Sequence, residues 1–203
     1  MKTPRNHDWH EGFSAPDVAF DPDDRQHVVQ FYDDDAYLVD LVARFLGVGL
    51  VGSEPLVAIV TEPHRRAVCA RLAAVGFDVD TAIHEGQLHF EDAHALLERL
   101  MVDGMPDAVR VRILVGGLLR EAQTGKHGPK RTRVFGEMVD ILWHRGDEIA
   151  AVRMEELWNG LQVDHPFHLL CAYCMNHTYR ETHATSIDQI HRAHTRVLAS
   201  PRL

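Results

Sequence analysis

Short apolar runs alternate along the chain with longer segments of helical periodicity, and this alternation constrains the fold more than any other feature. Runs rich in β-branched and aromatic residues, which favour strands, occupy 28–31, 56–61, 87–90, 132–135 and 167–173. Between them, apolar residues recur every three or four positions, as in amphipathic helices. Because a helix between two strands returns the chain to the same end of a sheet, such strands pair in parallel. The sequence therefore predicts a layered α/β domain with a mostly parallel sheet.

Glycine and proline mark where several of the predicted helices begin and end. The first helix includes 38–46, and we expect glycines from Gly47 onward to end it. Pro63 opens the second helix, which we expect to end at Gly76. Further helices are expected at about 93–101, 111–119, 138–146, 147–161 and 187–198.

Size and charge exclude several classes of protein. A chain of 203 residues with 45% hydrophobic residues can bury a sizeable core. Its net charge of −9 disfavours general binding to nucleic acid or to anionic lipid. Residues 1–26 are polar and contain three prolines, so we expect a mobile tail, or an arm that packs on a neighbour, followed by one domain over 27–200.

The cysteines and the hydropathy pattern indicate a cytoplasmic protein. Cys69, Cys171 and Cys174 are too few, and odd in number, for the disulfide framework of a secreted domain. Residues 1–26 lack the apolar run of a signal peptide, and no segment approaches the roughly 20 apolar residues that span a bilayer.

The turn after the first strand lies where a nucleotide-binding fold holds its phosphate loop. That loop needs glycines, a lysine and a hydroxyl residue, but the chain has Asp33, Asp34 and Asp35 there. These carboxylates would repel a triphosphate, and they can instead cap the next helix. The Gly125-Lys126 pair does not complete the motif, because His127 follows it. Since no nucleophile with a matching base stands out either, we expect no catalytic residues.

Three carboxylates, Glu62, Asp92 and Glu137, lie at the expected C-terminal ends of strands, where open parallel sheets bind ligands. Glu137 directly follows a predicted strand and is the best candidate for a ligand-binding residue. Alternatively, it caps its own helix or pairs with Arg133 or Arg153.

A second candidate group lies in the helix predicted at 147–161. Glu155 and Glu156 precede Trp158, so a carboxylate and an indole could face a ligand together. Alternatively, Trp158 belongs to the core and both glutamates face solvent.

A regular series of possible metal ligands follows that helix. Histidine and cysteine recur every third residue at His165, His168, Cys171, Cys174 and His177, and zinc, copper or haem iron accepts such donors. A strand has a period of two, however, so neighbours in the series point to opposite faces with α-carbons about 10 Å apart. Alternatively, Cys171 is a small buried residue and the histidines lie at the rim.

Several short motifs also occur in a distinctive order along the chain. They are His27, Phe31-Tyr32, Phe45-Leu46, Gly49-Leu50, Gly52-Ser53-Glu54, Gly76-Phe77-Asp78-Val79-Asp80, Gly86-Gln87-Leu88, Arg133-Val134-Phe135-Gly136-Glu137-Met138, Glu155-Glu156-Leu157-Trp158-Asn159, Leu170-Cys171-Ala172-Tyr173 and His194. In this order they resemble the MEDS family, a sensory domain described in methanogens, methylotrophs and a dichloromethane-responsive regulator. The resemblance covers about 27–198. This chain departs from the family's usual pattern at Cys174, where we expect proline or aspartate.

The resemblance implies a three-layer, RecA-like α/β fold without a phosphate loop. It also implies a non-enzymatic sensor of a small organic ligand, such as a hydrocarbon derivative, with no resident cofactor. Because no output domain follows Leu198, we expect the signal to pass through an oligomer or a partner. Family members stand beside histidine kinase, anti-sigma-type or DNA-binding regulator modules, and one of these classes is the expected partner.

We expect the ligand at the C-terminal edge of the sheet. The candidate ligand-binding residues there are Tyr32, Glu62, Asp92, Glu137, Glu156, Trp158 and Tyr173. His27 and His194 join the candidates as family landmarks, and the alternative for each is a buried histidine that donates to a backbone carbonyl. Two other functions stay open: a metal- or haem-responsive protein that uses His168, Cys171, Cys174 and His177, and a residual RecA-like nucleotide-dependent enzyme.

Overall fold

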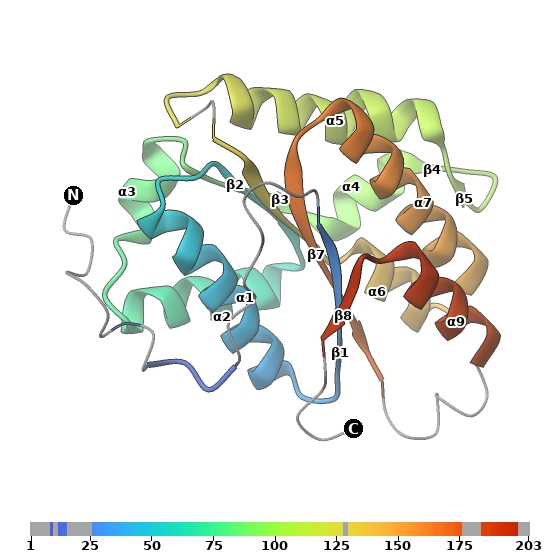
Figure 1. Cartoon of the computed structure of the whole chain (residues 1–203), viewed down its shortest axis with the longest axis horizontal. Coiled ribbons are helices and arrows are strands. Elements are labelled where there is room, and N and C mark those ends of the chain that lie inside the picture. The colour runs from blue at the N-terminus through green and yellow to red at the C-terminus, as the bar shows by residue number, and fades with distance from the viewer. Residues whose placement is uncertain (1–8, 10–11, 16–25, 128–129, 176–183, 199–203) are drawn as a thin grey trace.

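The computed structural model describes residues 9, 12–15, 26–127, 130–175 and 184–198, which form three layers (Figure 1). The middle layer is a six-stranded sheet in the order β3-β2-β6-β7-β1-β8, and every neighbouring pair is parallel. The strands are β1 (His27–Tyr32), β2 (Leu56–Val60), β3 (Leu88–Asp92), β6 (Thr132–Gly136), β7 (Phe167–Cys174) and β8 (Arg196–Leu198). The predicted α/β fold with a parallel sheet is confirmed.

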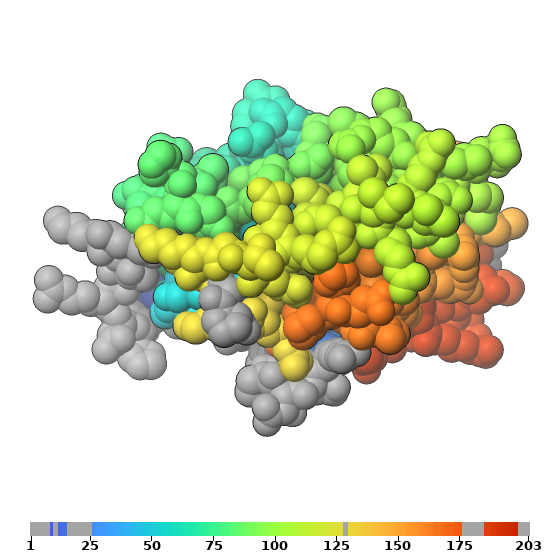
Figure 2. All heavy atoms as spheres, turned by 90° about the horizontal axis from the view of Figure 1, so that it is seen from above, coloured from blue at the N-terminus to red at the C-terminus, as the bar shows by residue number. Residues whose placement is uncertain are grey.

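Helices cover both faces of the sheet (Figure 1). On one face lie α1 (Asp35–Val51), α2 (Glu62–Ala74) and α3 (Val79–His84). On the other face lie α4 (Ala93–Leu100), α5 (Ala108–Thr124), α6 (Met138–His144), α7 (Glu148–Asp164) and α9 (Ala184–Ala193). Figure 2 shows α5, in yellow-green, beside α7, in orange, at the surface of this second layer.

Strand β7 shows how one sequence serves both faces. Phe167, Leu169 and Cys171 belong to the core under α7, whereas Leu170 and Ala172 belong to the core under α1. Strands β6 and β1 flank β7 on either side. The nearly continuous apolar sequence of this strand therefore correctly predicted a central position covered on both faces.

The predicted end of the first helix was wrong. Helix α1 continues through Gly47 and Gly49 to Val51. Both glycines are sites of close approach: a β-carbon at Gly49 would lie 2.3 Å from Leu56 Cδ2, and one at Gly47 would lie 2.9 Å from Trp9 Cζ3. The glycines permit packing here and do not end the helix. By contrast, Gly76 (φ 95°) follows α2 and Gly146 (φ 80°) follows α6, as predicted.

The C-terminal prediction was also wrong in part. The last helix, α9, ends at Ala193, and Leu198 lies in β8, which extends the sheet beyond β1. The helix α3 and the short antiparallel pair β4 (Met101–Val102) and β5 (Met105–Pro106) were not predicted. These elements have two to six residues, too few to show a periodicity.

The described part of the N-terminal segment packs on the first helical layer of its own chain. Trp9 and Phe13 are buried, and Trp9 packs edge-on against Phe77. Asp40 of α1 accepts hydrogen bonds from the backbone nitrogens of Ser14 and Ala15, at 2.5 and 2.8 Å. This buried carboxylate thereby fixes the segment to the domain.

Among the described helices, none is both long and apolar enough to cross a membrane.

Candidate functional site

Two neighbouring strands lead into helices on opposite faces of the sheet. Strand β2 continues into α2 on the first face, whereas its neighbour β6 continues into α6 on the second. Where adjacent parallel strands diverge in this way, a crevice opens at their C-terminal ends, and open α/β sheets bind ligands there. The residues that follow β2 and β6 are therefore the first place to look for a site.

Glu137 holds this crevice together from the β6 side. Its carboxylate is almost fully buried and accepts a hydrogen bond at 2.7 Å from the backbone nitrogen of Thr61, at the end of β2. His64 Nδ1 contacts the same carboxylate at 2.5 Å. That hydrogen bond raises the pKa of His64 above its ordinary value, although burial acts in the opposite direction. Glu137 makes neither of the ion pairs considered above, with Arg133 or Arg153, but links two strands to a histidine.

Asp140, one turn further along α6, organises the neighbouring strand ends. It accepts hydrogen bonds from the hydroxyl of Tyr32 in β1, at 2.9 Å, and from the backbone nitrogen of Cys174 in β7, at 2.8 Å. His144 Nδ1 lies 3.2 Å from Asp140 Oδ1. The hydrogen bond to Asp140 raises the pKa of His144 to about 9. Burial, aided by Asp140, raises the pKa of Tyr32, so its hydroxyl stays protonated and donates.

Two adjoining clefts open at this edge. One of about 450 Å³ is lined by Thr61, His64, Glu137, Asp140 and His144, among others. A larger one of about 1020 Å³ lies between α1 and α2, and the two share Asp35, Pro63 and His64. Among the described residues lining them, six carboxylates face two arginines and three histidines. The clefts therefore attract positive charge and hydrogen-bond donors more than anions.

The predicted capping role of the acidic turn at 33–35 is confirmed. Asp34 is the N-cap of α1, and its side chain accepts a hydrogen bond at 2.9 Å from the backbone nitrogen of Ala36. A carboxylate thus occupies the helix N-terminus that would otherwise attract a phosphate group.

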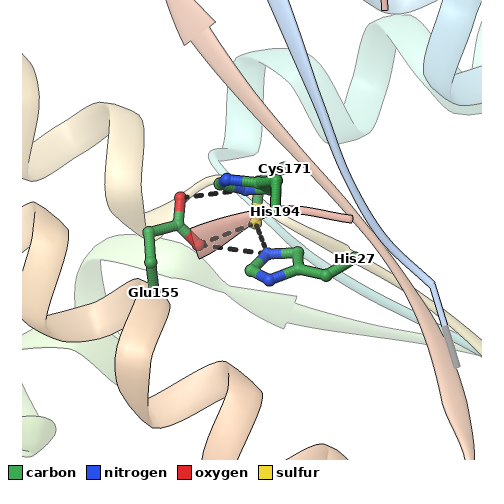
Figure 3. Close-up of side chains that lie close together, drawn as sticks. All are labelled: His27, Glu155, Cys171 and His194. Carbon is green, nitrogen blue, oxygen red and sulfur yellow. Dashed lines mark hydrogen bonds and ion pairs between the residues drawn. The ribbon is translucent and has the colours of Figure 1, made fainter. Parts of the chain in front are cut away.

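A separate buried cluster lies under α7 and α9 (Figure 3). Glu155 of α7 is fully buried and faces His27, Cys171 and His194. The hydroxyl of Tyr173 donates to Glu155 Oε1 at 2.7 Å. Burial opposes the charge of this carboxylate, but the two histidines and Tyr173 outweigh it and lower the pKa of Glu155 to about 2. Burial lowers the pKa of His194 to about 4.

A known protein family matches most of the chain. The family described as "MEthanogen/methylotroph, DcmR Sensory domain" matches residues 26–195. The chain belongs to the MEDS family. No curated protein sequence matches it significantly. Membership of a sensory-domain family indicates a sensory or regulatory role for this MEDS domain.

The MEDS domain brings some of the predicted site residues together and not others. Glu137 lines the smaller cleft, and the buried Tyr32 reaches it only through its hydrogen bond to Asp140. His27, Tyr173 and His194 belong to the buried cluster. His194 Nδ1 also contacts the backbone oxygen of Ile190 at 2.6 Å, so it does bond a carbonyl, as its alternative interpretation holds.

The remaining carboxylates and the tryptophan have local structural contacts. Glu62 lies in the exposed first turn of α2 near Arg65 and Arg66, and Asp92 caps α4 through the backbone nitrogen of Ala95. Glu156 pairs with Arg153 on the exposed side of α7. Trp158 is buried in the core against Phe167.

The described residues of the alternative metal set, His168, Cys171 and Cys174, do not meet. His168 and Cys174 lie in β7 at an even separation from each other and at an odd separation from Cys171, so Cys171 points to the face opposite theirs. His177 lies outside the described residues. Of this set, only Cys171 joins the buried cluster of the MEDS domain.

Asp140 and His64 were missed from the sequence, and Glu155 was considered only as one of a pair with Glu156. Asp140 lies within the otherwise apolar run Met138–Trp143, and Glu155 stands beside the exposed Glu156. His64 follows Pro63 at the start of α2, where the sequence shows only a surface turn. For Asp140 and Glu155 the sequence does contain one signal, because each is a charged residue on the apolar face of an amphipathic helix.

Proposed function

We propose that this MEDS domain binds a small organic ligand in the cleft at the C-terminal ends of β2 and β6 and passes the signal to a protein partner. The observation that carries the proposal is the buried Glu137 between Thr61 and His64. It stands where adjacent parallel strands diverge and it borders an open cleft. A charged group is buried at a cost, and such groups in a cleft commonly serve a ligand.

The charges favour one class of ligand. Over the two adjoining clefts together carboxylates outnumber basic residues, and the excess lies on the side of the larger cleft, at Asp33, Asp34 and Asp40. A small cation or a neutral hydrogen-bond donor that extends toward this side therefore fits better than a carboxylate or a phosphate. Together with the hydrocarbon derivatives that the family resemblance implies, this favours small alkylamines and related compounds. Methylammonium is the simplest probe of that class.

Signal transfer would use the strands that meet at the cleft. Asp140 contacts both Tyr32 of β1 and the backbone of Cys174 in β7, so a ligand that displaces α6 also acts on two central strands. By analogy with other members of the family, a histidine kinase, an anti-sigma-type protein or a transcription regulator is the proposed class of partner.

Native mass spectrometry of the protein purified from its own host tests the proposal first, since it reports any bound small molecule together with the subunit count. Calorimetric titration with methylammonium, acetate and phosphate then compares the three charge classes. We expect methylammonium to bind in preference to both anions.

Glu137→Gln is the matched test of the site, because it removes the charge and keeps the shape. We expect a loss of binding of about tenfold to a hundredfold, since a hydrogen bond to a charged group contributes about 1.5–3 kcal/mol. The control is Glu98→Gln, an exposed residue of α4 away from the clefts. Preferential binding of acetate or phosphate, or equal binding by Glu137→Gln and the wild type, would contradict the proposal.

A further inference from the structure

Four side chains of the buried cluster converge from four separate parts of the chain. His27 begins β1, Cys171 lies in the middle of β7, Glu155 lies on α7 and His194 follows α9. Each offers one donor atom, and these atoms all lie within 4.8 Å of one another (Figure 3). The side chains of Glu155 and both histidines have no exposed area.

In each histidine of the cluster Nδ1 makes an outer hydrogen bond, which leaves Nε2 for the centre of the cluster. Asn159 Nδ2 donates to the backbone oxygen of Ala193, so Asn159 Oδ1 is the acceptor for His27 Nδ1–H at 2.9 Å. His194 Nδ1–H likewise donates to the carbonyl of Ile190. Nε2 of each ring therefore points toward the carboxylate of Glu155.

His194 Nε2 is a buried nitrogen that makes no hydrogen bond to the part of the chain that the structure describes, and it faces Glu155 Oε1 at 3.4 Å. His27 Nε2 lies 3.1 Å from Glu155 Oε2. A metal cation placed between these two nitrogens and the carboxylate would take all three groups as ligands.

The distances fit a metal ion. With zinc–nitrogen and zinc–oxygen bonds of about 2.0–2.2 Å and a zinc–sulfur bond of about 2.3 Å, tetrahedral geometry separates neighbouring donors by about 3.3–3.6 Å. The Cys171 sulfur lies 3.3 Å from His27 Nε2 and 3.5 Å from Glu155 Oε2. Together with the 3.1 Å between His27 Nε2 and Glu155 Oε2, these separations are close to the three edges of one face of such a tetrahedron. His194 Nε2, the fourth donor, lies 3.4 Å from the other carboxylate oxygen, and all four donor atoms lie within 4.8 Å of one another.

We propose that His27, Glu155, Cys171 and His194 bind one divalent transition-metal ion of the zinc class. A thiolate and a carboxylate neutralise the two positive charges, so the complex suits a fully buried position. Asn159, Ile190 and Tyr173 already provide the outer hydrogen bonds that orient ligating imidazoles and carboxylates. The site is distinct from the proposed ligand cleft, and either can exist without the other.

The test uses the full-length chain without a histidine tag. Elemental analysis of the purified protein and titration of the chelator-treated protein with Zn²⁺ measure stoichiometry and affinity. We expect one equivalent of zinc. Substitution with Co²⁺ adds a thiolate-to-cobalt absorption band, which arises only when sulfur is a ligand.

Cys171→Ser should abolish that band and weaken zinc binding strongly, whereas Cys69→Ser, on α2 at the opposite face of the sheet, should leave both unchanged. Asn159→Ala keeps all four ligands but frees His27, and should weaken zinc binding about tenfold to a hundredfold. If circular dichroism shows that Cys171→Ser does not fold, zinc binding by Asn159→Ala decides whether the cluster is a metal site. Wild-type protein that binds no zinc, a cobalt–thiolate band that survives in Cys171→Ser, or undiminished affinity in Asn159→Ala would overturn the proposal.

Discussion

Replacing Asp140 with asparagine tests the electrostatic role of this buried residue at the cleft. The variant also loses the acceptor of the Tyr32 hydroxyl, a cost that is the same at both pH values compared below. The substitution preserves the shape of the side chain, and the amide oxygen can still accept from the backbone nitrogen of Cys174. It removes the negative charge beside His144, whose pKa the Asp140 carboxylate raises to about 9. We therefore expect the pKa of His144 to fall toward its ordinary value of 6.5 in Asp140→Asn.

The same pair contributes to stability in a defined range of pH. A histidine whose pKa is raised by folding stabilises the protein fully below pH 6.5, and this contribution disappears as the pH rises through about 9. A shift of this size would correspond to about 3 kcal/mol if it acted fully on folding. Because the His144 side chain is 53% exposed, solvent screening reduces the expected contribution to about 1 kcal/mol.

Two measurements follow from this reasoning. Proton NMR of the histidine C2–H signals gives the pKa of His144 in both proteins, and urea unfolding at pH 6 and pH 9 gives the stability. Wild-type protein should lose about 1 kcal/mol more than Asp140→Asn between these values. Glu98→Gln serves as the control for charge removal elsewhere. A wild-type His144 pKa near 6.5, or an unchanged pKa in the variant, would refute the coupling.

Two further substitutions test the packing described above, both by urea unfolding. Gly49→Ala should destabilise the protein by about 1–3 kcal/mol, since its β-carbon would overlap Leu56. Gly117→Ala should instead stabilise it by up to about 1 kcal/mol, because the nearest atom to its β-carbon lies 3.8 Å away. Equal effects of the two substitutions would contradict the packing role given to Gly49 in α1. Asp40→Ala should lower the free energy of unfolding by about 2–4 kcal/mol, because it leaves the backbone nitrogens of Ser14 and Ala15 without their acceptor. A loss below about 0.5 kcal/mol would show that attachment of the N-terminal segment contributes little to stability.

The fold was predictable because its information is local. Periodicities of two and about four identified most strands and helices, and short helices between strands implied parallel pairing. The acidic turn at Asp33–Asp35 and the position of Glu137 after a strand were also visible in the sequence. Each of these features depends on residues within one element or its immediate neighbour.

The side-chain partners were not predictable, because they join distant parts of the chain. Glu137 meets Thr61 across 76 positions, and His27 meets Cys171 across 144. The role of the glycines depends on distant residues too. In the sequence Gly49 indicates the end of a helix, and only the close approach of Leu56 shows that it serves packing. Histidine and cysteine at a regular spacing in β7 suggested one metal set, while three of the four clustered ligands come from other elements.

Mapping the chemical shifts of the uniformly ¹⁵N-labelled protein during titration with methylammonium tests the central proposal, that a small ligand binds at the C-terminal edge of the sheet. The account predicts saturable shifts at Thr61, His64, Glu137 and Asp140, and their loss in Glu137→Gln. Saturable shifts confined to other surfaces, such as the exposed side of α5 and α7, would contradict it.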